Sequence, residues 1–414
     1  MEKLLLLNLL FISILFSEEP LWKYKTDGAL TSASLDSSTS SLFFGSKDCN
    51  IYSVNSVTGE LRNKYAVSGE LGAPFYKDHC LYFPASDNTF RCINSLDFTL
   101  KWIFNPRGRP HEGFIYDNNV YFGCQDTYVY ALNVLDANKK WEFMTGKAVF
   151  ARPYAANGYL FIGSEDCNFY ALDAPRGSMI WSFKTEGGIY TSAAVKERIV
   201  YFTSSDSYLY ALNSISGSFY WKYKAGDQIL SSPCIHEDFL YLGCHDSNIY
   251  SINKNDGTLL WKSSIGAETI SQPCVLKSTV YIGSRDNCFY GFYSYTGKEI
   301  FKFQSGNWFD ASPCTDGMHV FIGSKDTYMY AFQHENGFSD NSFSSYLPSV
   351  FSVYPNPFRD HLVVKSVNGL RIHDIAGHLK AILPKGEIRI VTDSWKKGVY
   401  IVTNGINSKR MVKY

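Results

Sequence analysis

The chain has 414 residues, of which 45% are hydrophobic and 19% charged, with 39 basic and 39 acidic side chains. Zero net charge argues against a nucleic-acid-binding protein, which usually presents a basic surface, and against a polybasic membrane-surface segment. The hydrophobic content excludes a disordered chain. An aromatic fraction of 16% favours an all-β fold, because such side chains suit half-buried strands.

The N-terminal segment, residues 1–17, has the pattern of a signal peptide. Lys3 supplies a positive charge, an apolar stretch follows from Leu4 to Phe16, and Ser17 is a small residue at the predicted cleavage point. The stretch is short and uneven for a membrane span, and no later run of about twenty apolar residues occurs. We therefore expect an exported protein without a transmembrane segment.

Residues 18–337 repeat with a period near 40. A Gly-Ser-x-Asp-x-x-x-Tyr pattern starts at Gly45 and returns at Gly163 and Gly323. The Tyr is kept in seven of eight units, with Arg91 as the exception. Alternating apolar and polar residues between these marks predict short antiparallel strands. The eight acidic positions are Asp48, Asp87, Asp126, Asp166, Asp206, Asp246, Asp286 and Asp326.

A second mark, usually Trp, lies eleven residues beyond each Tyr, and most units have a turn glycine four residues before it. We expect the Asp to cap a tight turn, the glycine to supply a positive φ, and the Trp to wedge between neighbouring sheets. Four strands per unit predict a propeller blade. The Trp marks are Trp102, Trp141, Trp181, Trp221 and Trp261, while Asn63 and Phe301 depart from the pattern.

The two ends of the repeat region complement each other. The last unit lacks a Trp strand, and an unpaired Trp strand, Leu21–Tyr24 with Trp22, stands at the N-terminal end. If it completes the last blade, the ring closes without a free edge there. The sequence thus predicts an eight-bladed β-propeller of four-stranded blades.

The unit Ala171-Leu172-Asp173, Gly177 and Trp181 resembles the repeat of pyrroloquinoline-quinone (PQQ)-like propellers. That resemblance raises the alternative of a quinoprotein dehydrogenase, which adding the quinone and calcium would test. However, the chain has no vicinal cysteine pair, and blades of 39–40 residues leave no room for a cofactor-covering insertion. We therefore expect no enzyme activity, no catalytic residue, no cofactor and no metal.

The ten cysteines are spaced like structural residues. Cys124 and Cys244 occupy the slot that Ser46, Ser164 and Ser284 hold in other units. Exchange with serine indicates a small buried residue, so we expect most thiols to be free. A hairpin pair such as Cys80–Cys92 or Cys234–Cys244 stays open as an alternative.

The C-terminal part is a different module. Residues 338–350 are a Ser-rich linker, and residues 351–414 predict a small β-sandwich. Its opening Tyr354-Pro355-Asn356-Pro357, a Gly-x-Tyr strand at Gly398 and its basic end resemble the type A sorting domain of the type IX secretion system. The resemblance implies a member of the Bacteroidota, passage through the periplasm, the secretion machinery as a partner, and secretion or display at the cell surface. It leaves open whether the tail is cleaved.

Ligand binding is expected where the repeat is broken, because repeated positions serve packing. The inner strand of each blade carries small residues, and the exceptions should gather at one mouth of the channel. We expect a monomeric binding or scaffold protein for an unknown protein or glycan, with an outer-membrane-assembly propeller as the alternative. The candidate binding residues are Arg107, Arg109, His111, Glu112, Phe150, Arg152, Tyr190, Gln272, Trp308 and Phe309.

Overall fold

The computed structural model describes residues 19–334 and seven strands between residues 351 and 413. The chain divides into two units, Met1–His334 and Glu335–Tyr414. The predicted signal peptide, residues 1–17, and the predicted linker, residues 338–350, lie outside the described residues.

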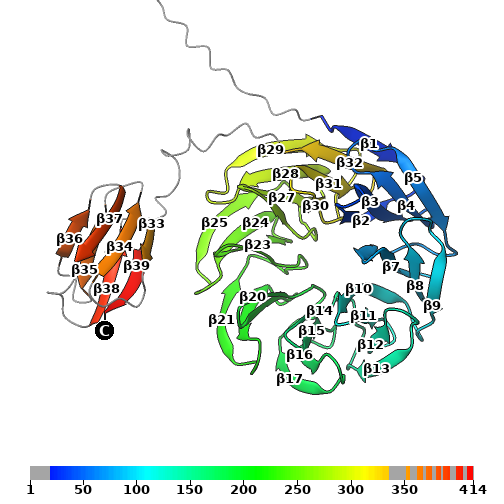
Figure 1. Cartoon of the computed structure of the whole chain (residues 1–414), viewed down its shortest axis with the longest axis horizontal. Helices are drawn as coiled ribbons and strands as arrows, with labels where there is room; N and C mark the ends of the chain where they lie inside the picture. The colour runs from blue at the N-terminus through cyan, green and yellow to red at the C-terminus, as the bar shows by residue number, and fades with distance from the viewer. Residues whose placement is uncertain are drawn as a thin grey trace, which may run out of the picture. The chain divides into compact units, whose positions relative to one another are not determined.

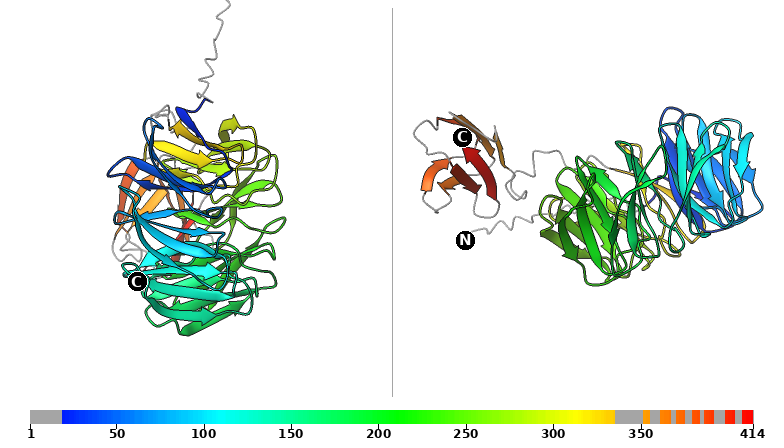
Figure 2. Two further views of the ribbon diagram at one scale, coloured as in Figure 1. Left: turned by 90° about the vertical axis from the view of Figure 1, so that its right-hand side faces the viewer. Right: turned by 90° about the horizontal axis from the view of Figure 1, so that it is seen from below.

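The first unit is an eight-bladed propeller of four-stranded antiparallel sheets (Figure 1), as the sequence predicts. Figure 2 shows the same sheets from the side. Blade 1 contains β2 (Leu30–Asp36), β3 (Ser41–Ser46), β4 (Asn50–Asn55) and β5 (Leu61–Ala66). Blade 2 contains β6 (Phe75–Lys77), β7 (Cys80–Ala85), β8 (Thr89–Asn94) and β9 (Leu100–Phe104). Blade 3 contains β10 (Pro110–Tyr116), β11 (Asn119–Cys124), β12 (Tyr128–Asn133) and β13 (Lys139–Met144). Blades 4 and 5 contain β14 (Tyr154–Ala156), β15 (Tyr159–Gly163), β16 (Asn168–Asp173) and β17 (Met179–Lys184); β18 (Ala194–Lys196), β19 (Ile199–Thr203), β20 (Tyr208–Asn213) and β21 (Phe219–Lys224). Blade 6 contains β22 (Cys234–His236), β23 (Phe239–Cys244), β24 (Asn248–Asn253) and β25 (Leu259–Ser264). Blade 7 contains β26 (Cys274–Leu276), β27 (Thr279–Gly283), β28 (Cys288–Tyr293) and β29 (Glu299–Gln304). Blade 8 contains β30 (Cys314–Thr315), β31 (His319–Gly323), β32 (Tyr328–Gln333) and β1 (Trp22–Lys25).

The N-terminal strand closes the propeller. β1 pairs antiparallel with β32, with Trp22 opposite Ala331 and Lys25 opposite Tyr328. The last blade therefore takes three strands from the C-terminal end of the repeats and its outer strand from the N-terminal end. This confirms the predicted closure.

The repeated aspartate caps the turn between the second and third strands of a blade, and it also binds two further groups. In blade 4, Asp166 Oδ1 accepts the backbone N–H of Asn168 at 2.8 Å. Its Oδ2 accepts the Tyr170 hydroxyl at 2.7 Å and the N–H of Gly146, in the preceding inter-blade loop, at 2.6 Å. In blade 2, Arg91 replaces the tyrosine, and its Nη2 lies 2.7 Å from Asp87 Oδ2. In six of the eight blades the carboxylate thus ties its turn to the preceding inter-blade loop.

The repeated tryptophan and glycine meet at the interface between successive blades. Trp141 of blade 3 donates its indole N–H to Ala174 O of blade 4 at 2.9 Å. Gly177 of blade 4 has a φ of 75° and lies under the same indole ring, so close that a Cβ there would be 2.5 Å from the ring. The same contact joins Trp22 to Gly59, Trp181 to Gly217, Trp221 to Gly257 and Trp261 to Gly297.

The interface between blades 1 and 2 is built the other way round. Blade 1 has Asn63 in the Trp position, and blade 2 has Phe98 in the glycine position with a φ of 60°. Asn63 Nδ2 donates to Leu96 O at 2.8 Å, and the buried Phe98 ring lies 6.4 Å from that of Phe43 in blade 1. Here the aromatic ring comes from the following blade instead of the preceding one.

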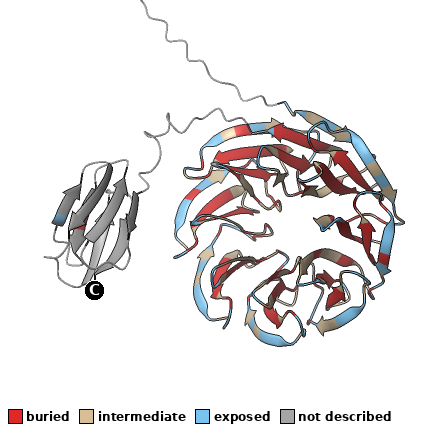
Figure 3. Ribbon diagram, viewed as in Figure 1, coloured by how far each residue is buried: buried red, intermediate tan, exposed pale blue. Residues whose placement is uncertain are grey.

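The core lies between the sheets. The middle strands of each blade are buried and the outer strands are largely exposed (Figure 3). Phenylalanines stack across blade interfaces, as Phe169 does on Phe202 with ring centroids 3.9 Å apart and Phe90 on Phe122 at 4.2 Å. Such pairs place aromatic side chains in the core between neighbouring sheets.

All ten cysteines are free. Cys244 shows why cysteine exchanges with serine: its thiol approaches Asp227 O at 3.2 Å and Gln228 O at 3.5 Å, as the Ser164 hydroxyl approaches Lys147 O and Ala148 O. The expectation of mainly free thiols is confirmed, and neither hairpin pair is bonded.

The second unit contains two antiparallel sheets, as predicted for a β-sandwich. Their orders are β33-β34-β37 and β36-β35-β38-β39. The described part of the chain contains no helix that could cross a membrane. The strands are β33 (Phe351–Tyr354), β34 (His361–Ser366), β35 (Leu370–Asp374), β36 (Leu379–Leu383), β37 (Gly386–Val391), β38 (Gly398–Thr403) and β39 (Ser408–Lys413).

Candidate binding site at the channel mouth

The entry segments of the inner strands are joined side by side around the axis. The backbone N–H of Ser192 donates to the Ser232 hydroxyl at 2.9 Å, and that of Gln272 donates to Ser312 at 3.0 Å. The N–H of Ser312 donates to Ser32 at 2.8 Å, which links blade 8 to blade 1. Serine hydroxyls at these positions therefore join blade 5 to blade 6, and blade 7 to blade 8 and blade 1, at the mouth of the channel.

A hollow of about 240 Å³ lies at this mouth. A second hollow of about 100 Å³ adjoins it, because His111 and Glu112 line both. The larger hollow is lined by side chains from blades 1 and 3 to 8, namely Ser32, His111, Glu112, Phe150, Arg152, Tyr190, Thr191, Ser192, Leu230, Ser232, Ile270, Gln272, Asp310 and Ser312. Six of the ten predicted residues meet there, and Arg109 lines the smaller hollow.

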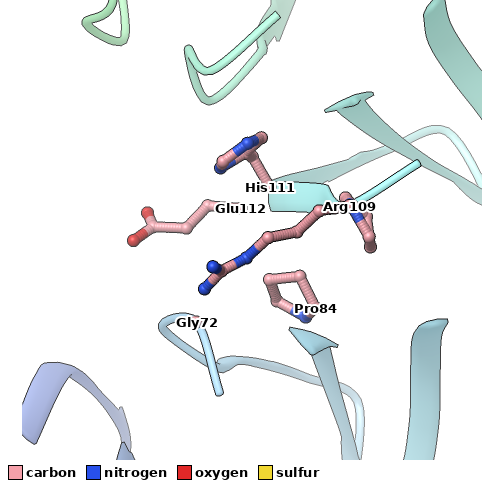
Figure 4. Close-up of a pocket in the computed structure, with 6 residues that line it drawn as sticks. Gly72, Pro84, Arg109, His111 and Glu112 are labelled. Carbon is pink, nitrogen blue, oxygen red and sulfur yellow. The ribbon is translucent and has the colours of Figure 1, made fainter. Parts of the chain in front are cut away.

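An irregular inner strand presents the two titratable groups of blade 3. The register of β10 shifts between Pro110 and Gly113, so the intervening His111 and Glu112 are not paired with β11. Both extend from the start of β10 beside Arg109, and the Glu112 carboxylate points away from the sheet of blade 3 (Figure 4), at the hollow that it lines. The bulge therefore frees these side chains from the sheet and presents them at the mouth.

Burial sets the charge of both groups. It lowers the pKa of His111 to about 4, and the nearby Arg109 charge acts in the same direction. Its Nε2 is buried without a hydrogen-bond partner among the described residues. Burial raises the pKa of Glu112, and the positive charge of Arg152 opposes that rise. His111 is thus neutral at physiological pH, and ionised Glu112 is held at an electrostatic cost.

Arg152 enters the mouth from blade 4 and is held against blade 3. Its Nε donates to Gly113 O at 3.1 Å. The guanidinium carbon lies 5.7 Å from the ring centroid of Phe114 and 6.0 Å from that of Phe75. These contacts fix the side chain in one direction, so the guanidinium is positioned before any ligand arrives.

Blade 8 adds an acidic group that the sequence analysis missed. Asp310 Oδ1 lies 2.8 Å from Arg285 Nε, and its Oδ2 lies 2.5 Å from Lys325 Nζ. Burial would raise the pKa of Asp310, but the hydrogen bonds from these two cations outweigh it and hold the pKa below its usual range. The sequence did contain a sign of this residue, because Asp310 stands at a repeat position that holds apolar or aromatic residues in other blades, namely Phe150, Tyr190, Leu230 and Ile270.

Three predicted residues lie elsewhere. Arg107 is exposed and points to the outer strand of blade 3, where its Nη2 lies 3.1 Å from Glu142 Oε1. Phe309 is not at the mouth, because its side chain is fully buried between blades 7 and 8. Trp308 is 41% exposed on the rim beside Asp310, with Arg285 at 5.2 Å and Lys325 at 4.8 Å from its ring centroid.

The arrangement suits recognition of a polar ligand. Glu112 and Gln272 can accept hydrogen bonds, Arg152 and Gln272 can donate them, and exposed Tyr190 offers an aromatic face. Within the described residues no cluster of His, Cys, Asp and Glu has the arrangement of a metal site.

Comparisons with known proteins agree on the fold. The crystal structure of BamB from Moraxella catarrhalis superposes with a TM-score of 0.68 at 13% identity, covering 76% of this chain and 99% of that one. A computationally designed protein, Ika8, gives 0.69 at 14% identity, covering 75% and 97%. No curated protein sequence matches.

A family model described as outer membrane protein assembly factor BamB matches residues 16–223 and 245–340, which is most of the chain and nearly the whole propeller. The match includes the aspartate turns, the Trp–Gly interfaces and the entry strands of the channel mouth other than β22 of blade 6. The chain therefore belongs to the family of outer membrane protein assembly factor BamB.

Proposed function

We propose that this protein is a non-catalytic binding propeller of the cell envelope that holds a segment of a partner protein at the channel mouth. One observation carries the proposal. The entry position that is serine in blades 1, 5, 6 and 8 is Glu112, Arg152 and Gln272 in blades 3, 4 and 7. Burial opposes ionisation of the Glu112 carboxylate, so this residue lowers the stability of the fold. Residues kept at a cost to stability are typical of functional sites.

The direct test is site-specific photo-crosslinking in cells. A photoreactive residue at exposed Tyr190 should form an adduct with an envelope protein. The matched control is Met318, which is 64% exposed in the turn before β31, between the first two strands of blade 8. That turn is at the opposite end of the inner strands from the mouth. Equal adducts from both positions, or none from Tyr190, would contradict the proposed site.

Affinity for the captured partner should then depend on the mouth residues. Glu112→Gln, Arg152→Ala and Gln272→Ala should each weaken binding by about 1–3 kcal/mol if they act as hot spots. Arg152→Ala also removes a hydrogen bond and two ring contacts, so its stability must be measured in parallel. A glycan ligand, the other candidate, would appear as glycan-array binding with the same mutational pattern and no protein adduct.

For the route, we propose export to the periplasm and then transfer to the surface by the type IX secretion system. The support is the tail, whose Tyr354-Pro355-Asn356-Pro357 opening and basic end resemble a sorting domain, and whose strands form two sheets. Deleting residues 350–414 should leave the propeller folded and retained in the periplasm. Normal surface display of the truncated protein would refute this route.

A second candidate function is assembly of outer-membrane proteins, and the family match favours it. Such a role would keep the propeller in the periplasm and bring it to other envelope proteins. Disrupting the gene should then lower the amount of folded outer-membrane β-barrel proteins. Unchanged levels, together with surface display of the wild type, would favour the surface-binding role.

A further inference from the structure

The outer circumference of the propeller is basic, although the chain as a whole has no net charge. The eight outer strands β1, β5, β9, β13, β17, β21, β25 and β29 together carry twelve Lys or Arg residues and two Glu residues, Glu142 and Glu299. Lysine on an edge strand protects against aggregation, which explains a basic edge in general. It does not explain the apolar residues found on one part of that edge.

A β-bulge at the start of the outer strands exposes two consecutive side chains. In blade 5, Ala211 pairs with Trp221 and Leu212 with Phe219, so Tyr220 is the extra residue. Phe219 and Tyr220 are consequently 50% and 48% exposed. The same register shift recurs in blades 4 and 6 at Ile180 and Leu260. The backbone thus presents a pair of adjacent outward positions in each of blades 1 to 7.

Among the seven blades with this bulge, three adjacent blades fill both positions with apolar or aromatic residues. We call these six exposed side chains the apolar arc, which comprises Met179, Ile180, Phe219, Tyr220, Leu259 and Leu260. β17, β21 and β25 follow one another along the circumference (Figure 1). The equivalent pairs in blades 1, 2, 3 and 7 contain a charge, at Arg62, Lys101, Lys139 with Lys140, and Glu299; in blade 8 the two residues before Trp22 are Pro20 and Leu21, outside β1. The arc therefore departs from the repeat and is not a consequence of the fold.

Positive charge follows the arc along each strand. Lys184, Lys222, Lys224 and Lys262 are exposed, and β17, β21 and β25 contain no Asp or Glu. In the part of the chain that the structure describes, none of these four ammonium groups forms a salt bridge; Lys222 lies over the Tyr208 ring at 4.0 Å from its centroid. The nearest acids in sequence, Glu186 and Asp227, are exposed in the loops that follow β17 and β21, while Asp173 and Asp256 accept hydrogen bonds within the preceding turns.

We propose that the apolar arc and its four lysines dock the propeller on a bilayer leaflet that contains anionic phospholipid. Apolar and aromatic side chains next to exposed lysines that form no salt bridge match an interface where acyl chains lie below phosphate groups; Lys184 donates only to the backbone carbonyl of Asp166, at 2.6 Å. Charge complementarity favours this occupant over a protein edge, because the three strands of the arc carry four exposed lysines and no acid. The site is separate from the channel mouth, so a partner can be bound there at the same time.

Vesicle co-sedimentation of the full chain tests the proposal. The protein should bind phosphatidylcholine vesicles containing phosphatidylglycerol, bind pure phosphatidylcholine less, and dissociate as salt is raised. Phe219→Ser with Leu259→Ser should reduce binding at least tenfold. The matched control is Leu61→Ser with Leu100→Ser, which removes equally exposed leucines from blades 1 and 2 and should leave binding unchanged. All variants share the same termini, so binding through the termini cancels in the comparison.

The charge contribution has its own matched pair. Lys222→Gln with Lys224→Gln should weaken vesicle binding about fivefold for each lysine removed. Lys23→Gln with Lys64→Gln removes two lysines from blades 8 and 1 and should have no effect. Equal losses from arc and control pairs, or no preference for anionic vesicles, would overturn the proposal. The proposal would also be overturned if the wild-type protein bound no vesicles and the arc variants lost a crosslinked adduct with another protein. The arc would then be a protein contact surface.

Discussion

The Trp–Gly interface predicts a large cost for adding a single methyl group at Gly177. The residue has a φ of 75°, where a Cβ costs about 1–2 kcal/mol. The new Cβ would also lie 2.5 Å from Cδ2 and 2.7 Å from Cε3 of Trp141. Moving the indole would stretch its hydrogen bond to Ala174 O, so overpacking adds about 1–3 kcal/mol. Gly177→Ala should therefore destabilise the propeller by about 2–5 kcal/mol.

Gly158→Ala is the matched control for this variant. Gly158 has a φ of 83°, and a Cβ there would meet nothing within 4 Å, so it should cost only about 1–2 kcal/mol. Urea denaturation followed by tryptophan fluorescence gives both values. In a Trp141→Leu background the cost of Gly177→Ala should fall to that of Gly158→Ala. Equal costs of the two glycine variants in the wild-type background would refute the contact argument.

Three further predictions concern closure and pH. Deleting residues 18–26 removes β1 and should lower stability by several kcal/mol in the same denaturation assay, and an unchanged midpoint would contradict closure. The contribution of neutral His111 to stability is fully present above the pKa of the unfolded chain, near 6.5, and it is lost as pH falls toward the pKa of about 4 in the folded protein. His111→Gln should therefore make the free energy of unfolding depend less on pH between these two values. Because burial raises the pKa of Glu112, its ionised form opposes folding; Glu112→Gln should raise the melting temperature at pH 8, with a gain that shrinks on acidification. If the stability of either variant changed with pH in the same way as that of the wild type, the pKa shift given for the replaced residue would be wrong.

Most of the fold follows from the repeat, because each mark has one mechanical role that recurs in most blades. The acid at Asp166 predicts its turn, Gly177 its positive φ, and Trp22 the closing strand, and all three are observed. The hydrogen bond from Gly146 to the same carboxylate was not predictable. It joins neighbouring blades, and sequence spacing does not show which loop approaches a turn from another sheet.

The mouth was predictable only in outline. Residues that break the repeat on inner strands, such as Glu112 and Arg152, do meet at one hollow. Side-chain direction was not predictable in the loops, where no period fixes it. Arg107 turns outward to Glu142, and Phe309 turns into the core. The zero net charge likewise concealed an uneven distribution, because composition cannot show that the outer strands are basic.

The reversed interface between blades 1 and 2 restricts how such a propeller can change its number of blades. Blades 4, 5 and 6 each have a Trp on one side and a glycine on the other. Duplicating or losing one of them by recombination would therefore leave a Trp facing a glycine at each new blade interface. Blade 2 placed after a Trp-bearing blade would put the Phe98 ring and an indole into one slot. Blade 1 placed before a glycine-bearing blade would leave Asn63 facing an empty slot. Blades 1 and 2 are therefore exchangeable only as a joined pair.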